Sequence, residues 1–302
     1  MGKIQVGIFF LFVFSLFSSC EQQKKKEGFI ITATTSIIKD ALENLMPVDV
    51  EILSLMGPGI DPHLYKPTSA DLGKLRRADI IVYNGLALEG KMGGILENLS
   101  KKKTTLAVSS FINVKELIPS SSFKASYDPH IWFDVDLWKR GMIGLSDSIY
   151  SIQKWNSEIA HTPNYKDTLE NLNEWVIKNL KTIPEEKRVL VTAHDAFGYF
   201  GRAYGLEVVA LQGISTLSEA GLKDIENLIE FIMDRKIKSV FVESIISPKA
   251  IKAVIQGCRL KGYEVMLGGT LYSDAMGPVG TEEDNYPGMI RYNVRIIINS
   301  LR

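Results

Sequence analysis

Short apolar runs alternate with longer helical segments from residue 29 to the end of this 302-residue chain. The apolar runs lie at 29–33, 48–53, 78–83 and 104–108, and again at 188–192, 206–211, 238–242 and 263–267. Parallel strands need a crossover connection, usually a helix, so this alternation predicts parallel sheets covered by helices. We therefore expect an α/β fold of two lobes, each with a four-stranded parallel sheet flanked by helices.

Two consecutive helical segments, 136–153 and 164–182, separate the two groups of strands. The second is amphipathic and is stopped by Pro184. We expect it to form one long backbone helix that joins the lobes. The predicted boundaries are 29–162 for the N-terminal lobe, 163–184 for the linking helix and 185–302 for the C-terminal lobe.

Two helix starts in the second half carry capping signals. Thr216 and Glu219 have the spacing of a capping box, and Ser247-Pro248 places proline at the first helical position. We therefore expect helices to begin near Thr216 and near Ser247. A glycine-rich loop is expected at 268–277, directly after the last strand.

The N-terminal residues differ in composition from the rest of the chain. Lys3 precedes an apolar run at 4–17, which is followed by Ser18-Ser19-Cys20 and by a polar run at 21–27. An apolar run of this length is typical of a signal peptide rather than a membrane span, and a cysteine after small residues resembles a bacterial lipoprotein cleavage site. We expect a signal peptide at 1–19, a lipid anchor on Cys20 and a polar tether at 20–28. An ordinary secretory signal that ends in cysteine is the alternative.

This prediction places the mature protein on a bacterial membrane, facing the periplasm or the cell exterior. Cys258 is the only other cysteine, so we expect no internal disulfide and interpret Cys258 as a small core residue. The 35 basic residues equal the 35 acidic ones, which gives no electrostatic case for nucleic acid. We expect a monomer.

The four histidines of the chain are unevenly placed. Two occur in the same tripeptide, Asp61-Pro62-His63 and Asp128-Pro129-His130, where proline restricts the backbone and makes a stiff turn. His63 follows the second predicted strand, His130 follows the fourth, and His194 ends the fifth. His161 lies between two predicted helices, and we interpret it as an exposed linker residue.

Ligands of open α/β sheets bind beyond the carboxyl ends of the strands. Asp274, in the glycine-rich loop after the last predicted strand, has that position, as do the three histidines at strand ends. Two ligands from each lobe would meet in a cleft, where three imidazoles and one carboxylate make a nearly closed shell for a divalent metal. Taken singly, each residue fits a turn or a surface site equally well.

Longer motifs accompany these residues, at 59–68 (GIDPHLYKPT), 128–132 (DPHIW), 191–200 (VTAHDAFGYF), 213–215 (GIS) and 271–274 (LYSD). In this order, from Thr32 to the C-terminus, the chain resembles the ZnuA/TroA-like family. These are metal-binding lipoproteins that serve bacterial zinc and manganese ABC transporters as extracytoplasmic solute receptors. The resemblance implies a rigid linking helix, a membrane permease as partner, and one transported divalent metal ion held by His63, His130, His194 and Asp274.

Glu243, at the end of the seventh predicted strand, matches a further position of the family. The resemblance leaves two roles for it, as support for a metal ligand or as a cap for the next helix.

The choice of metal lies between zinc and manganese. Imidazole ligands favour zinc, and the resemblance points the same way, because manganese-dedicated members often carry glutamate where this chain has His194. Many zinc receptors of the family carry a long His- and acid-rich loop after the first ligand, but here Leu64 leads directly to Thr68. That absence favours manganese or mixed use. We expect zinc, with manganese as the alternative.

Two other classes of function compete with a metal receptor. A zinc-dependent hydrolase keeps an open coordination position beside a general base, whereas Asp274 would fill the fourth position here, and the chain has no His-Glu-x-x-His motif. In an adhesin-type surface lipoprotein, the convergence of the four residues would be coincidence. We therefore expect a receptor without enzymatic activity.

Overall fold

The computed structural model describes residues 28–120, 126–155 and 163–302. The predicted signal peptide, the lipid anchor on Cys20 and His161 lie outside these ranges. Among the described helices, none combines the length and the hydropathy that a membrane crossing requires.

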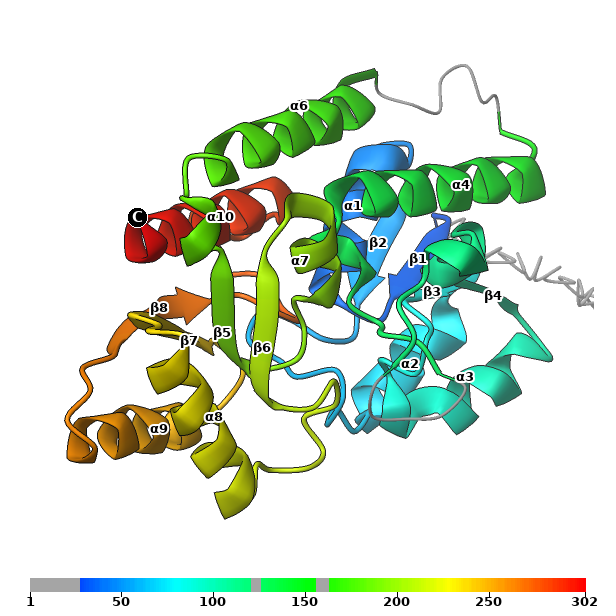
Figure 1. Ribbon diagram of the computed structural model, residues 1–302. Helices are drawn as coiled ribbons and strands as arrows, with labels where there is room; N and C mark the ends of the chain where they lie inside the picture. The colour runs from blue at the N-terminus through cyan, green and yellow to red at the C-terminus, as the bar shows by residue number, and fades with distance from the viewer. Residues whose placement is uncertain (1–27, 121–125, 156–162) are drawn as a thin grey trace, which may run out of the picture.

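The N-terminal lobe is built on a four-stranded parallel sheet of order β2-β1-β3-β4 (Figure 1). Its strands are β1 (Ile30–Ala33), β2 (Glu51–Ser54), β3 (Ile80–Tyr83) and β4 (Thr104–Ala107). The central strands β1 and β3 are almost wholly buried, which explains why both read as continuous apolar runs. The connecting helices are α1 (Ser36–Leu45), α2 (Ser69–Arg77) and α3 (Gly93–Ser100).

The C-terminal lobe contains β5 (Val189–His194), β6 (Glu207–Gln212), β7 (Ser239–Glu243) and β8 (Met266–Leu271). β5 pairs in parallel with β6, β7 pairs in parallel with β8, and β5 lies beside β7. Helices α7 (Gly198–Tyr204), α8 (Leu222–Asp234) and α9 (Lys249–Leu260) follow the first three of these strands. The predicted α/β class with parallel strands and flanking helices is confirmed. The single four-stranded sheet predicted for this lobe is wrong, because the strands form two two-stranded sheets, β5-β6 and β7-β8. Where β5 lies beside β7, the side chain of Glu243 accepts the N–H groups of Ala193 and His194 in place of strand pairing.

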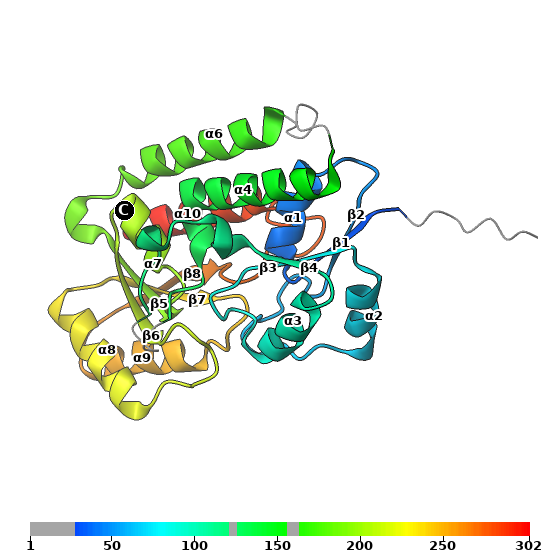
Figure 2. The same ribbon diagram turned by 90° about the vertical axis from the view of Figure 1, so that its right-hand side faces the viewer.

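A long helix, α6 (Pro163–Leu180), packs against α4 (Val135–Gln153) and α10 (Tyr286–Leu301), and Figure 2 shows it along the top of both lobes. Its buried residues belong to one hydrophobic cluster that also contains Ile31 of β1, Trp138 of α4 and Tyr286 of α10. The predicted backbone helix is therefore present, and it packs into a core that both lobes share. The buried residues that it contributes are Tyr165, Leu169, Leu172, Val176 and Leu180.

The helix start predicted near Thr216 is wrong. Helix α8 begins at Leu222, where the Gly221 N–H donates to Asp224 Oδ2 (N–O distance 2.8 Å). The Thr216 hydroxyl instead donates to Asp61 Oδ2 of the other lobe (2.6 Å). A hydrogen bond to a carboxylate is stronger than a neutral side-chain cap, so the long-range contact prevails over the local one.

The last strand begins and ends later than expected, and it includes the first glycines of the predicted loop. A Cβ atom on Gly268 would lie 2.7 Å from the ring of Phe241 in β7. Glycine therefore permits close approach to the neighbouring strand at this point rather than marking a loop. The loop that carries Asp274 starts after Leu271.

Asp40 of α1 ties the N-terminal lobe to α10, because its Oδ2 accepts a hydrogen bond from the Tyr286 N–H (3.1 Å). Burial raises the pKa of Asp40 to about 6, although the hydrogen bond from Tyr286 lowers it. A carboxylate with a raised pKa in the folded state stabilises the fold while protonated and loses that contribution as pH rises through the folded pKa.

Asp40→Asn keeps an acceptor for the Tyr286 N–H and removes the titration. Near pH 4 the variant should match the wild type, whereas near pH 7 its free energy of unfolding should be higher by about 1–2 kcal/mol. Urea unfolding of the metal-free protein at both pH values measures the difference. Asp49→Asn, an exposed carboxylate between α1 and β2, is the control. A pH-independent effect of Asp40→Asn would contradict the prediction.

Candidate metal centre

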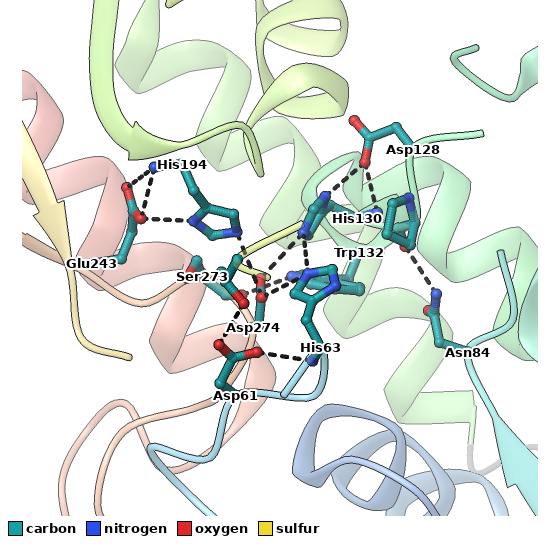
Figure 3. A network of polar contacts seen from close by, with 12 residues as sticks. Asp61, His63, Asn84, Asp128, His130, Trp132, His194, Glu243, Ser273 and Asp274 are labelled. Atoms are coloured by element: carbon teal, nitrogen blue, oxygen red, sulfur yellow. Dashed lines mark hydrogen bonds and ion pairs between the residues drawn. The ribbon is translucent and has the colours of Figure 1, made fainter. Parts of the chain in front are cut away.

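The four residues predicted as metal ligands meet at the boundary between the lobes (Figure 3). His63 lies in the turn after β2, His130 after β4, and Asp274 after β8, while His194 is the last residue of β5. One ligand atom of each lies within 4.8 Å of the other three, and all four side chains are buried. The carboxyl ends of parallel strands thus bring together residues that are distant in sequence.

Both oxygens of the Asp274 carboxylate face imidazole rings. Oδ2 lies 3.3 Å from Nε2 of His63 and 3.5 Å from Nε2 of His194. Oδ1 lies 3.4 Å from Nε2 of His130, and the Nε2 atoms of His63 and His130 are 3.4 Å apart. All three rings therefore turn the same nitrogen toward the carboxylate.

These atoms are buried without ordinary partners. Within the described residues, neither oxygen of Asp274 nor Nε2 of His194 has a hydrogen-bond partner of good geometry. A buried carboxylate without hydrogen bonds is costly, and a divalent cation between these atoms would remove that cost. Three imidazole nitrogens and one carboxylate oxygen suit zinc, and they form a set that manganese can also use.

The ring of His130 is held by Asp128 of the same tripeptide. Asp128 Oδ1 lies 2.7 Å from His130 Nδ1 and accepts the His130 backbone N–H at 2.9 Å. A proton on Nδ1, shared with this carboxylate, leaves the lone pair on Nε2 for a metal. The preceding Pro129 carbonyl accepts from Asn84 Nδ2 at the end of β3 (2.9 Å), which fixes the turn against the sheet.

The ring of His194 is held in the same way by Glu243, the last residue of β7. Glu243 Oε2 lies 2.7 Å from His194 Nδ1, and Oε1 accepts the Ala193 N–H at 2.9 Å. Of the two roles left open for Glu243, these contacts favour support of His194, because the carboxylate faces β5 and not the start of α9.

His63 has a different environment. Asp61 Oδ1 accepts the His63 backbone N–H (2.8 Å) and so fixes the turn, but it does not contact the ring. Among the described residues, no carboxylate is bonded to Nδ1 of His63. The two Asp-Pro-His tripeptides therefore share a turn but not a mode of ring support.

Trp132 connects the ligand segments of the two lobes. Its Nε1–H donates to the carbonyl of Ser273, next to Asp274 (2.9 Å), and its own carbonyl accepts from the Tyr286 hydroxyl (2.7 Å). The Trp132 ring also packs edge-on against His130, with centroids 5.3 Å apart. This contact fixes the Asp274 loop relative to the His130 segment.

The electrostatics of the centre favour positive charge. Burial alone lowers the pKa of His130, but the charges of Asp274 and Asp128 outweigh it and raise that pKa to about 9. The pKa of His194 is likewise raised well above its usual value, because Asp274 and Glu243 outweigh burial. Burial raises the pKa of Asp274, but the two imidazoles hold it well below its usual range.

Sequence reasoning missed the roles of Asp61, Asp128 and Asn84. The repeated aspartate two residues before each histidine was a signal for the first two, because Asx turns bond the N–H two residues on. No signal marked Asn84, whose partner lies 45 residues away.

Comparison with known proteins agrees with the geometry. The family model for the periplasmic zinc-uptake complex component A (ZnuA) matches residues 31–300. The manganese-binding lipoprotein MntA of Bacillus subtilis is 44% identical over 274 residues, which cover 90% of this chain and 89% of MntA. The manganese ABC transporter substrate-binding lipoprotein PsaA of Streptococcus anginosus is 30% identical over 284 residues, covering 90% of this chain and 88% of PsaA.

Among solved structures, the periplasmic zinc-binding protein TroA from Treponema pallidum superposes with a TM-score of 0.86 at 41% identity. The superposition covers 91% of this chain and 99% of TroA. Because the family model matches almost all of the described chain and the relatives align over most of their length, the chain belongs to the ZnuA family of periplasmic metal-uptake components.

Proposed function

We propose that the protein captures one divalent transition-metal ion between its two lobes and delivers it to the membrane permease of an ABC transporter. The observation that carries this proposal is the buried cluster of three Nε2 atoms around the carboxylate of Asp274, which has no hydrogen-bond partner among the described residues. The names of the relatives support it, since they describe metal-binding lipoproteins and a transporter substrate-binding protein.

Zinc is the metal we favour, because three of the four ligands are imidazoles. Manganese is the second candidate, because the relative that is 44% identical is named a manganese-binding lipoprotein. Metal analysis of protein purified without chelator or affinity tag decides between them. The absence of any bound metal would contradict the function itself.

We further propose that the receptor is a monomer held by a lipid on Cys20 to a bacterial membrane, where it faces the periplasm or the cell exterior. The N-terminal lobe spans residues 29–162, the linking helix 163–184 and the C-terminal lobe 185–302. A fourth protein ligand in place of an open coordination position supports metal capture rather than hydrolysis.

His130→Ala removes one ligand and leaves Asp128 without its ring partner. The affinity for zinc should fall by more than about 100-fold, since losing even an outer partner of a ligand costs 10–100-fold. Isothermal calorimetry against a competing chelator measures the affinity and should give one ion per wild-type chain. His161→Ala is the matched control, because this histidine is outside the proposed ligand set. An unchanged affinity in His130→Ala would exclude this residue from the shell.

Metal binding should release protons. The ligands bind metal through neutral imidazole, and the raised pKa values of His130 (to about 9) and His194 mean that protons compete up to mildly alkaline pH. The apparent zinc affinity should therefore rise between about pH 6 and about pH 9. Titration in buffers of different ionisation enthalpy counts the released protons. A constant affinity across this range would contradict a histidine-based site.

His194→Glu combined with Glu243→Gln tests whether imidazole at position 194 sets the metal preference. The second change avoids two carboxylates at the 2.7 Å separation that His194 and Glu243 now have. The variant shell has two nitrogens and two carboxylates and is harder, so the ratio of zinc to manganese affinity should fall by about 10-fold or more. Competition between the metals in one buffer measures the ratio, with Glu243→Gln alone as control. An unchanged ratio would exclude His194 as a determinant.

A further inference from the structure

The segment after β6, residues 213–217, lies against the first lobe at the side of the metal centre where His63 is placed. His63 lines a cavity of about 310 Å³ together with residues of both lobes. Leu86, Tyr127 and Pro129 line it from the first lobe, and Ile214, Ser215 and Leu217 line it from the second.

Ile214 lines this cavity together with His63. It is only 6% exposed, yet it belongs to none of the three hydrophobic clusters found among the described residues. Its burial therefore comes from the cavity wall at the lobe boundary rather than from the core of its own lobe. The position of residues 213–217 depends on what holds them against the first lobe.

A single carboxylate makes that connection. The Thr216 hydroxyl donates to Asp61 Oδ2 (2.6 Å), and Asp61 Oδ1 accepts the backbone N–H of His63 (2.8 Å). One oxygen of Asp61 thus holds residues 213–217, and the other holds the turn of His63, a proposed metal ligand. His63 is also the imidazole whose Nδ1 has no carboxylate partner among the described residues, so its position depends more on its turn than those of His130 and His194 do.

Other contacts between the ligand segments do not involve residues 213–217. Trp132 and Tyr286 form buried hydrogen bonds, and Phe133 stacks on Phe197 with ring centroids 4.3 Å apart. An opening motion that exposes the metal would therefore leave these contacts in place and break the partly buried Thr216–Asp61 bond.

We propose that Thr216 is a positioning residue for metal retention: it clamps residues 213–217 onto Asp61, steadies His63 and slows release of the ion. This inference rests on the proposed metal-receptor function. A hydrogen bond to a charged acceptor that forms only in the closed state lowers the release rate more than it changes the association rate.

Thr216→Val replaces the hydroxyl by a methyl group of the same shape. The full-length protein loaded with zinc is mixed rapidly with excess chelator, and release is followed by the absorbance of the chelator complex. Thr216→Val should release zinc about 10-fold faster than wild type, while the association rate changes by less than about 3-fold. Thr216→Ser restores a hydroxyl and should return the release rate to that of the wild type.

Thr182→Val is the matched control, because the Thr182 hydroxyl donates to the Asn179 carbonyl near the end of α6 (2.7 Å), away from the metal centre. Equal thermal unfolding of the metal-free variants shows that all are folded. The inference is overturned if Thr216→Val releases zinc at the wild-type rate, or if Thr216→Ser releases it as fast as Thr216→Val. Either result leaves the metal-receptor function intact. Failure of the wild type to bind zinc or manganese overturns the function instead.

Discussion

The buried carboxylate of Asp274, surrounded by three imidazoles, is the interaction on which the arrangement of this molecule depends. Its oxygens lie 3.3–3.5 Å from three Nε2 atoms and, within the described chain, have no hydrogen-bond partner. Such a cluster is stable only with bound protons or with a cation in place of them. Because His63 and His130 come from one lobe and His194 and Asp274 from the other, an ion that neutralised the cluster would also hold the lobes together. Metal binding and closure of the lobe boundary would then be one event, and the free energy of the first would stabilise the second.

The fold allows little freedom away from that boundary. A single hydrophobic cluster runs from β1 through α4 and α6 to α10, so the lobes are packed against one helix and against each other. Interiors packed at this density resist continuous deformation, and a displacement must therefore concentrate where packing is thinnest. One cavity at the lobe boundary lies at the side of His63 and residues 213–217. The rings of His130 and His194, each held by a buried carboxylate, have the firmer support.

Local sequence signals predicted the helices and strands well, but they predicted contacts between residues distant in sequence poorly. The strands and the long helix followed from apolar periodicity, because burial of a face is a local requirement. Thr216 shows where this reasoning fails: its spacing to Glu219 fits a capping box, but its hydroxyl bonds a carboxylate 155 residues away. Gly268 shows the same limit, since its close approach to Phe241 depends on strand pairing that the sequence does not display. The cluster of three histidines and Asp274 could be predicted because strand ends are recognisable, and a parallel sheet places its strand ends at one edge. Of the two carboxylates behind the rings, Glu243 was marked by the family resemblance, with its role left open, whereas Asp128 was marked only by the repeat of aspartate before histidine.

The carboxylates behind the rings bear directly on metal preference. Asp128 and Glu243 share the Nδ1 protons of His130 and His194, which makes both rings more basic and brings two further negative charges close to the ion. The proposed ligand atoms are three nitrogens and one oxygen, a set that is typical of a zinc site. The charge around those atoms is that of a carboxylate-rich centre, which also suits a harder ion such as manganese. The family contains relatives named for each metal, and 44% identity to a manganese-binding lipoprotein coexists here with an imidazole-rich shell. We therefore expect the pairs of ring and carboxylate to set the metal preference together, so that a change at Asp128 or Glu243 would act on the metal through the histidine it holds.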